Sequence, residues 1–150
     1  MGPEERIAEA VETRLGTFVK RAEQALMAEK ADALRPFGLS VPQYAVMYAL
    51  SIAPGCSGAQ LARVCYVTPQ SMASLLSTLE SKKLVERRPS EVHAQVMVTR
   101  LTRSGHALLR KADAAALAVE ARLSAAFTPE EESLLRRLLQ RATDTLAAER

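Results

Sequence analysis

The sequence predicts a mainly α-helical domain with one small β-hairpin near its centre. Three observations lead to this prediction. Apolar residues recur at three- and four-residue steps through most of the chain, several stretches begin with side chains typical of helix caps, and one β-rich stretch interrupts the helical pattern. With 150 residues, 48% of them hydrophobic and 25% charged, the chain has the size and balance of one ordinary globular domain.

The N-terminal segment predicts one long amphipathic helix. Apolar residues recur at helical spacing from Ile7 to Leu26, and the pattern continues toward Leu34. We expect the helix to end there, because Arg35 precedes Pro36 and the residue before a proline disfavours helical backbone angles.

Two shorter helices are expected next. Ser40 and Ser57 are each followed three residues later by a glutamine, which is the spacing of a capping box, and they predict helices at 41–53 and 58–65. The stretch APGCSG between them has the proline and glycine of a turn.

The stretch VTPQSMASLLSTLE predicts a further helix, which Thr68 caps and which runs from Pro69 to Glu80. One face of this helix carries its large apolar residues, which are Met72, Leu75, Leu76 and Leu79. The opposite face carries almost only Gln, Ser, Thr and Ala, so it is small and uncharged.

A β-hairpin and two helices complete the prediction. The β-rich runs Leu84–Arg88 and Gln95–Leu101 flank a polar centre, as in a hairpin. Thr102 then caps a long helix that continues through Leu123, and Thr128 begins the last helix, with a proline at its first position and a capping-box glutamate.

A short helix, a tight turn, a helix and a basic hairpin follow one another in the order of a winged helix-turn-helix. The 40–104 segment would be this DNA-binding lobe, and 1–39 and 105–150 would be flanking dimerisation helices of the same domain. The lobe holds seven Lys and Arg against three Glu, whereas both flanks are close to neutral. Basic charge at this place favours a double-stranded DNA partner, in which the uncharged helix face reads bases and the basic residues hold phosphates.

The stretch LARVCYVTPQSMASLLSTLESKKLVERRPSEVHAQVMVTRLTRSG resembles the winged helix-turn-helix core of the multiple-antibiotic-resistance regulator (MarR) family. The most specific matches are Leu61-Ala62, Val67-Thr68-Pro69, Leu79-Glu80, Leu84 to Arg88, and Leu101-Thr102 with Gly105. The resemblance extends to GLSVPQYAVMYAL and to both terminal helices. It implies a homodimeric transcriptional regulator, commonly a repressor, on a pseudo-palindromic operator near its own gene.

The resemblance and the charge pattern together name candidate DNA contacts. Recognition-helix contacts would come from Thr68, Gln70, Ser71 and Ser74, and phosphate contacts from Arg63, Lys82, Lys83, Arg87, Arg88 and Arg100. At the wing tip this sequence has His93 and Gln95 where the family usually has Asp and Arg, so a minor-groove contact there would be made by Gln95. His93 either adds charge at mildly acid pH or is a solvated loop residue. Lys83 stands where the family typically has Gly, so either the helix ends differently or the residue bears left-handed strain.

The resemblance also implies release from DNA by a small, often phenolic or aromatic, ligand bound between the dimerisation helices and the DNA-binding lobe. Candidate ligand residues are Phe37, Tyr44, Met47, Tyr48 and Met72, although Met and Tyr at this spacing also fit a plain core. Wide apolar stripes on the terminal helices favour a homodimer over a compact monomeric bundle.

Other functions find less support in the sequence. A redox switch at Cys56 or Cys65, and a helical protein-protein adaptor without DNA binding, stay open as alternatives. Catalytic motifs, metal-ligand spacing and cofactor loops are not found, so we expect no enzyme activity, no metal and no cofactor. The sequence has no apolar run long enough for a membrane span and no signal-peptide pattern, and we expect a cytoplasmic location.

Overall fold

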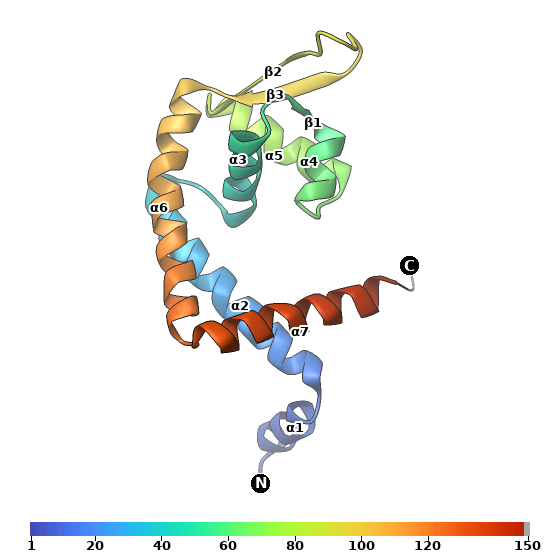
Figure 1. The fold of residues 1–150 in the computed structure, drawn as a ribbon, viewed down its shortest axis with the longest axis vertical. Coiled ribbons are helices and arrows are strands. Elements are labelled where there is room, and N and C mark those ends of the chain that lie inside the picture. The colour runs from blue at the N-terminus through green and yellow to red at the C-terminus, as the bar shows by residue number, and fades with distance from the viewer. Residues whose placement is uncertain (149–150) are drawn as a thin grey trace. The chain divides into compact units, whose positions relative to one another are not determined.

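The computed structural model describes residues 1–148 and confirms the expected fold class, mostly helical with a small antiparallel sheet (Figure 1). Its elements are α1 (Pro3–Glu12), α2 (Leu15–Leu34), the 3-10 helix η1 (Arg35–Phe37), α3 (Val41–Ile52), β1 (Cys56–Ser57), α4 (Gly58–Val64), α5 (Pro69–Ser81), β2 (Val85–Pro89), β3 (Met97–Leu101), α6 (Arg103–Ala125) and α7 (Pro129–Ala147). The chain divides into two compact units, Met1–Ala116 and the part from Leu117 onward.

Side-chain caps begin the helices where the sequence places them. At the start of α3, the Ser40 hydroxyl accepts from the Gln43 N–H at 3.2 Å, and the Gln43 side chain accepts from the Ser40 N–H at 3.0 Å. The same reciprocal pair of bonds is present at Ser57 for α4 and at Thr128 for α7. These bonds satisfy backbone donors that a helix start would otherwise leave without partners.

The expectation of one continuous N-terminal helix is wrong. The helix is broken between α1 and α2, where Arg14 has an extended backbone with φ −101° and ψ 124°. Two threonines take up backbone carbonyls at the break, because the Thr13 hydroxyl donates to Ala10 O at 2.8 Å and the Thr17 hydroxyl donates to Val11 O at 2.7 Å. Threonine side chains compete with helical backbone bonds in this way, and apolar periodicity alone does not reveal the competition.

The sheet has three strands in the order β1-β3-β2, all antiparallel. The hairpin strands pair in the register Val85↔Leu101 through Pro89↔Met97, as the sequence predicts in outline, and the hairpin extends beyond the helices of its unit (Figure 1). The sequence does not predict β1, because its two residues form a strand only by pairing with Thr99 and Val98 of β3.

The core of the first unit lies where α2, α3, α4, α5, α6 and the sheet meet. Its fully buried side chains include Leu34, Val46, Met47, Leu50, Leu61, Met72, Leu76 and Leu79. The apolar stripe of α5 supplies three of these, so burial of that stripe fixes which face of the helix remains in solvent.

The C-terminal end of α5 is closed by a Schellman motif. The Leu84 N–H donates to Leu79 O at 3.0 Å and the Lys83 N–H donates to Glu80 O at 2.9 Å. Lys83 has φ +60°, so of the two alternatives for this position, the left-handed one is observed.

The residue that caps α6 is bonded to this helix end and to Leu84, the residue just before β2. The Thr102 N–H donates to Leu84 O at 3.0 Å, and the Thr102 hydroxyl donates to Lys83 O at 2.7 Å while it accepts from the Gly105 N–H at 3.0 Å. A Cβ added at Gly105 would lie 2.1 Å from Leu84 O. Only glycine allows α6 to approach the Leu84 backbone this closely.

Candidate nucleic-acid interface

The exposed face of α5 is small and uncharged, as the sequence predicts. Gln70, Ser71, Ala73 and Ser74 are exposed, whereas the opposite stripe is buried in the core except at Leu75, which is half-buried. Small side chains on a helix surface let its backbone approach base edges, and amide and hydroxyl groups can donate to and accept from bases. The face therefore has the size and chemistry of a surface that reads the major groove.

Thr68 caps α5, and its hydroxyl is already engaged. The Thr68 hydroxyl accepts from the Ser71 N–H at 3.0 Å and donates to the Ser71 hydroxyl oxygen at 3.0 Å. The hydrogen of the Ser71 hydroxyl stays available for another acceptor. Of these two candidate contacts, Thr68 holds the helix start and Ser71 offers the free donor.

The hairpin register separates the basic residues of the wing into two faces. Arg87 pairs with buried Thr99 and shares its face with Val85, so it lies on the face that meets the core. Its Nε is buried and has no hydrogen-bond partner within residues 1–148. Arg88 and Arg100 lie on the opposite, open face.

The open face of the hairpin carries a small positive excess. The Arg88 guanidinium lies 3.2 Å from a carboxylate oxygen of Glu86, which is the cross-strand partner of Arg100. The Arg100 guanidinium packs over Gly55, where an added Cβ would lie 3.2 Å from Nη2. Gly55 has φ +84°, so this turn both needs glycine for its backbone and leaves room for the arginine.

The remaining basic candidates lie around the two helices of the motif. Arg63 is exposed on the last turn of α4, and Lys83 is exposed just after α5. The Lys82 ammonium donates to the Gly38 carbonyl at 2.8 Å, so it ties the end of α5 to the segment before α3. A phosphate contact by Lys82 would have to compete with this bond.

The wing tip is organised by a serine and carries few charges. The Ser90 hydroxyl accepts from the N–H groups of Val92 and His93 at 3.2 and 3.3 Å. His93 and Gln95 are both exposed, and Val92 beside them is 81% exposed. Both side chains are thus accessible to a partner, as a contact with DNA would require.

The five candidate ligand residues are only partly brought together. Met47 and Met72 are fully buried in the core. Tyr44 and Tyr48 stack with ring centroids 6.1 Å apart, and the Tyr44 hydroxyl donates to Asp113 of α6. Phe37 packs against the core from η1, and Tyr48 is 46% exposed.

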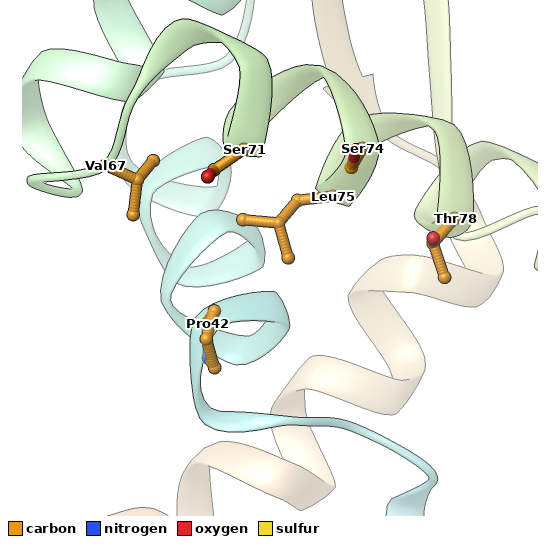
Figure 2. A pocket seen from close by; sticks show the side chains of 6 residues that line it. All are labelled: Pro42, Val67, Ser71, Ser74, Leu75 and Thr78. Carbon is orange, nitrogen blue, oxygen red and sulfur yellow. The ribbon is translucent and has the colours of Figure 1, made fainter.

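A shallow pocket lies on α5 itself, between this helix and the start of α3. Figure 2 shows its lining side chains, with Leu75 directed toward α3 and Ser71, Ser74 and Thr78 following one another along α5. The pocket has a volume of about 410 Å³, and Pro42 and Val67 complete its lining. It shares Ser71 and Ser74 with the predicted base-reading face and contains none of the five predicted ligand residues.

The two cysteines are free and partly buried. Burial raises the pKa of the Cys65 thiol, and negative charge on Cys56 would raise it further. A raised pKa lowers the fraction of reactive thiolate at neutral pH, which weighs against Cys65 as a redox sensor. No group of three potential metal ligands and no helix able to cross a membrane is found among the described residues.

Sequence comparison places this lobe among known proteins. The sequence model of the MarR family matches residues 37–95. The HTH-type transcriptional repressor Rv2887 of Mycobacterium tuberculosis is 35% identical over 127 residues, which cover 85% of this chain and 91% of the repressor.

Solved structures agree with this comparison. The structure of Rv2887 in complex with DNA is 35% identical, with a TM-score of 0.69 and coverage of 86% of this chain and 97% of that chain. The complex of the same protein with p-aminosalicylic acid is 35% identical, with a TM-score of 0.67 and coverage of 87% and 98%.

Proposed function

The chain belongs to the MarR family, and from this premise we propose that it is a transcriptional repressor that binds an operator in double-stranded DNA as a homodimer. The observation that carries the proposal is the exposed face of α5. A helix that buries most of its apolar stripe and leaves the small, uncharged side chains of Ser71, Ala73 and Ser74 in solvent is suited to enter a major groove.

Base reading and phosphate binding would be performed by different residues. Gln70 would read adenine, and Ser71 and Ser74 would bond to base edges or to nearby phosphates. Phosphate contacts would come from the exposed basic side chains around the motif, which are Arg63, Lys83, Arg88 and Arg100. Gln95 and His93 would approach the adjacent minor groove from the wing tip.

Dimerisation is supported by apolar side chains that a single chain leaves in solvent. On α2, Leu15, Phe18 and Val19 are exposed, and α7 leaves leucines exposed on the stripe from Leu134 to Leu146. Monomeric proteins rarely leave rows of large apolar side chains in solvent, whereas a second copy would cover them on each of these helices. Two copies would place two recognition helices about 34 Å apart, which requires a pseudo-palindromic operator.

The proposal is tested by fluorescence anisotropy with the purified protein. The DNA that flanks its own gene is compared with a shuffled fragment of equal composition, each across a series of salt concentrations. We expect roughly thousandfold tighter binding to the operator fragment, with log affinity falling linearly against log salt. Equal, weak binding to both fragments, or no binding at low salt, would contradict operator recognition by this fragment and favour the adaptor alternative.

We also propose release from DNA by a small aromatic carboxylate, since the relative Rv2887 has been crystallised with p-aminosalicylic acid. Two positions are candidates. One lies near the stacked Tyr44 and Tyr48, together with Phe37, Met47 and Met72, and the other is the pocket on α5. A ligand in the α5 pocket would cover Ser71 and Ser74 and so exclude DNA directly.

Calorimetric titration of salicylate into the DNA-free protein distinguishes the two positions. Tyr48→Ala should abolish binding if the tyrosine pair holds the ligand, and Leu75→Ala should abolish it if the ligand occupies the α5 pocket. Unchanged binding in both variants would contradict both positions.

We propose a cytoplasmic location and no catalytic activity for this repressor. The proposed target, operator DNA, lies in the cytoplasm, and the residues of the candidate interface have side chains suited to binding DNA rather than to catalysing a reaction.

A further inference from the structure

Tyr66 combines two unfavourable properties in the turn between α4 and α5. Its backbone has φ +56°, in the left-handed region that a bulky side chain rarely adopts. Its side chain is 95% exposed, and its hydroxyl makes no hydrogen bond within residues 1–148. Because the ring is exposed, it contributes no stabilisation from burial of apolar surface, and the left-handed backbone is itself unfavourable. Neither the exposed side chain nor the backbone conformation of Tyr66 therefore stabilises the fold.

The backbone conformation at Tyr66 follows from the way α4 ends. The Val67 N–H donates to Ala62 O at 3.1 Å and the Tyr66 N–H donates to Arg63 O at 3.4 Å. These are the two bonds of a Schellman motif, which requires a left-handed residue and usually has glycine there. The turn therefore explains the conformation but not the tyrosine, which suggests that the side chain has a use outside the fold.

The place of Tyr66 indicates what that use is. It stands two residues before Thr68, the cap of α5, and the first residues of a recognition helix lie closest to the base edges. In this motif the first helix crosses the phosphate backbone and the second enters the groove, so we expect the turn that joins them to lie close to the phosphates.

The charge around Tyr66 suits an anionic partner. From Ala53 to Leu79 the sequence contains no Asp or Glu, and Arg63 is its one charged residue. Arg63 lies three residues before Tyr66, in the last turn of α4, and its side chain is exposed.

We propose that Tyr66 anchors the recognition helix on the operator, its phenolic hydroxyl donating a hydrogen bond to a phosphate oxygen at the edge of the major groove. Tyrosine hydroxyls are among the groups that contact phosphates, and such contacts fix the register of a protein on DNA without reading sequence. The inference rests on the proposed function, and the contact is not among those that the sequence predicts.

The test is Tyr66→Phe, which removes the hydroxyl and keeps the ring. We expect affinity to fall by about three- to tenfold, the loss of one hydrogen bond, and by the same factor for operator and shuffled DNA. The slope of log affinity against log salt should stay unchanged, because no charge is removed. A Tyr66→Gly variant should lose affinity to at least the same extent, while its Tm stays equal to that of the wild type or rises by about 2–4 °C as strain is relieved.

Operators with single neutral methylphosphonate substitutions provide the matched control. The wild type should lose affinity at several phosphates in each half-site. Tyr66→Phe should be insensitive to substitution at one of them and should respond as the wild type does at the others. Wild-type affinity of Tyr66→Phe, or a loss confined to the operator fragment, would overturn the inference. Absence of operator preference in the wild type would instead contradict the proposed function, so the two failures are distinguishable.

Discussion

Gly105→Ala sets two physical effects of opposite sign against each other. Replacing a glycine inside a helix by alanine normally stabilises a protein by about 0.5–1 kcal/mol, because the unfolded chain loses freedom. At this position, however, the new Cβ would lie 2.1 Å from Leu84 O, 3.1 Å from Leu84 C and 3.3 Å from Leu101 Cδ2. The nearest atoms belong to the backbone, which cannot rotate away as a side chain can.

The distances set the size of the expected effect. To reach an ordinary contact, the first turn of α6 must move by about 1 Å from the β2 backbone. Overpacking of this kind costs about 1–3 kcal/mol, and weakening the two bonds from Thr102 to Leu84 O and Lys83 O costs about 0.5–1.5 kcal/mol each. After subtraction of the helix-propensity gain, we expect Gly105→Ala to lower the free energy of unfolding by about 1–5 kcal/mol.

Urea unfolding followed by circular dichroism measures this effect, at one fixed protein concentration because dimerisation adds to apparent stability. Gly16→Ala is the matched control, since Gly16 lies in the first turn of α2 and an added Cβ meets nothing within 4 Å. We expect the control to be neutral or stabilising. A Gly105→Ala midpoint equal to or above that of the wild type would refute the steric argument.

Three further predictions concern the ends of helices and the cysteines. Lys83→Gly should raise the free energy of unfolding by about 1 kcal/mol, because it relieves the left-handed strain at φ +60°; calorimetry tests this, and a Tm equal to that of the wild type would contradict it. The same variant should make the slope of log affinity against log salt shallower by roughly 0.9 for each phosphate that Lys83 neutralises in the wild type, which anisotropy measures. Thr68→Ala should lower the free energy of unfolding by about 1 kcal/mol through loss of the bond from the Ser71 N–H, while Thr78→Ala on the same helix should not. Because burial raises the pKa of Cys65, its alkylation at pH 8, measured peptide by peptide, should be slower than alkylation of the amino acid cysteine in solution, and it should accelerate as the pH rises. Equal alkylation rates for Cys65 and for the amino acid at pH 8 would contradict this prediction.

Local signals in the sequence predicted most of the fold. Capping residues such as Ser40, Ser57 and Thr128 act on backbone groups within three residues, so they can be read without knowledge of the tertiary structure. The features that sequence reasoning missed depend on specific competition or on distant partners. The break at Arg14 comes from threonine hydroxyls that bond to carbonyls, and β1 exists only because β3 lies beside it.

The features of the candidate interface also divide into those that local sequence predicts and those that depend on distant contacts. The character of the exposed face of α5 follows from helical periodicity, and the structure agrees with it. The different surroundings of Arg87 and Arg88 depend on strand register, and the bond from Lys82 to Gly38 joins residues far apart in sequence. Tyr66 could have been found, because a helix end followed closely by a cap needs a left-handed residue, and the sequence VCYVT offers no glycine for it.

The bonds made by Thr102 join the end of α5, the start of β2 and the first turn of α6 at one point. We expect the reading helix and the wing to turn together with this part of α6, so that one lobe has a single rotational phase on DNA. On an operator read by two copies, each inserted base pair would rotate one half-site by roughly 35° relative to the other. Because the recognition helix and the wing of one lobe cannot rotate independently, the lobe cannot compensate for a rotated half-site. Repression should therefore oscillate with the number of base pairs between the half-sites rather than decline smoothly.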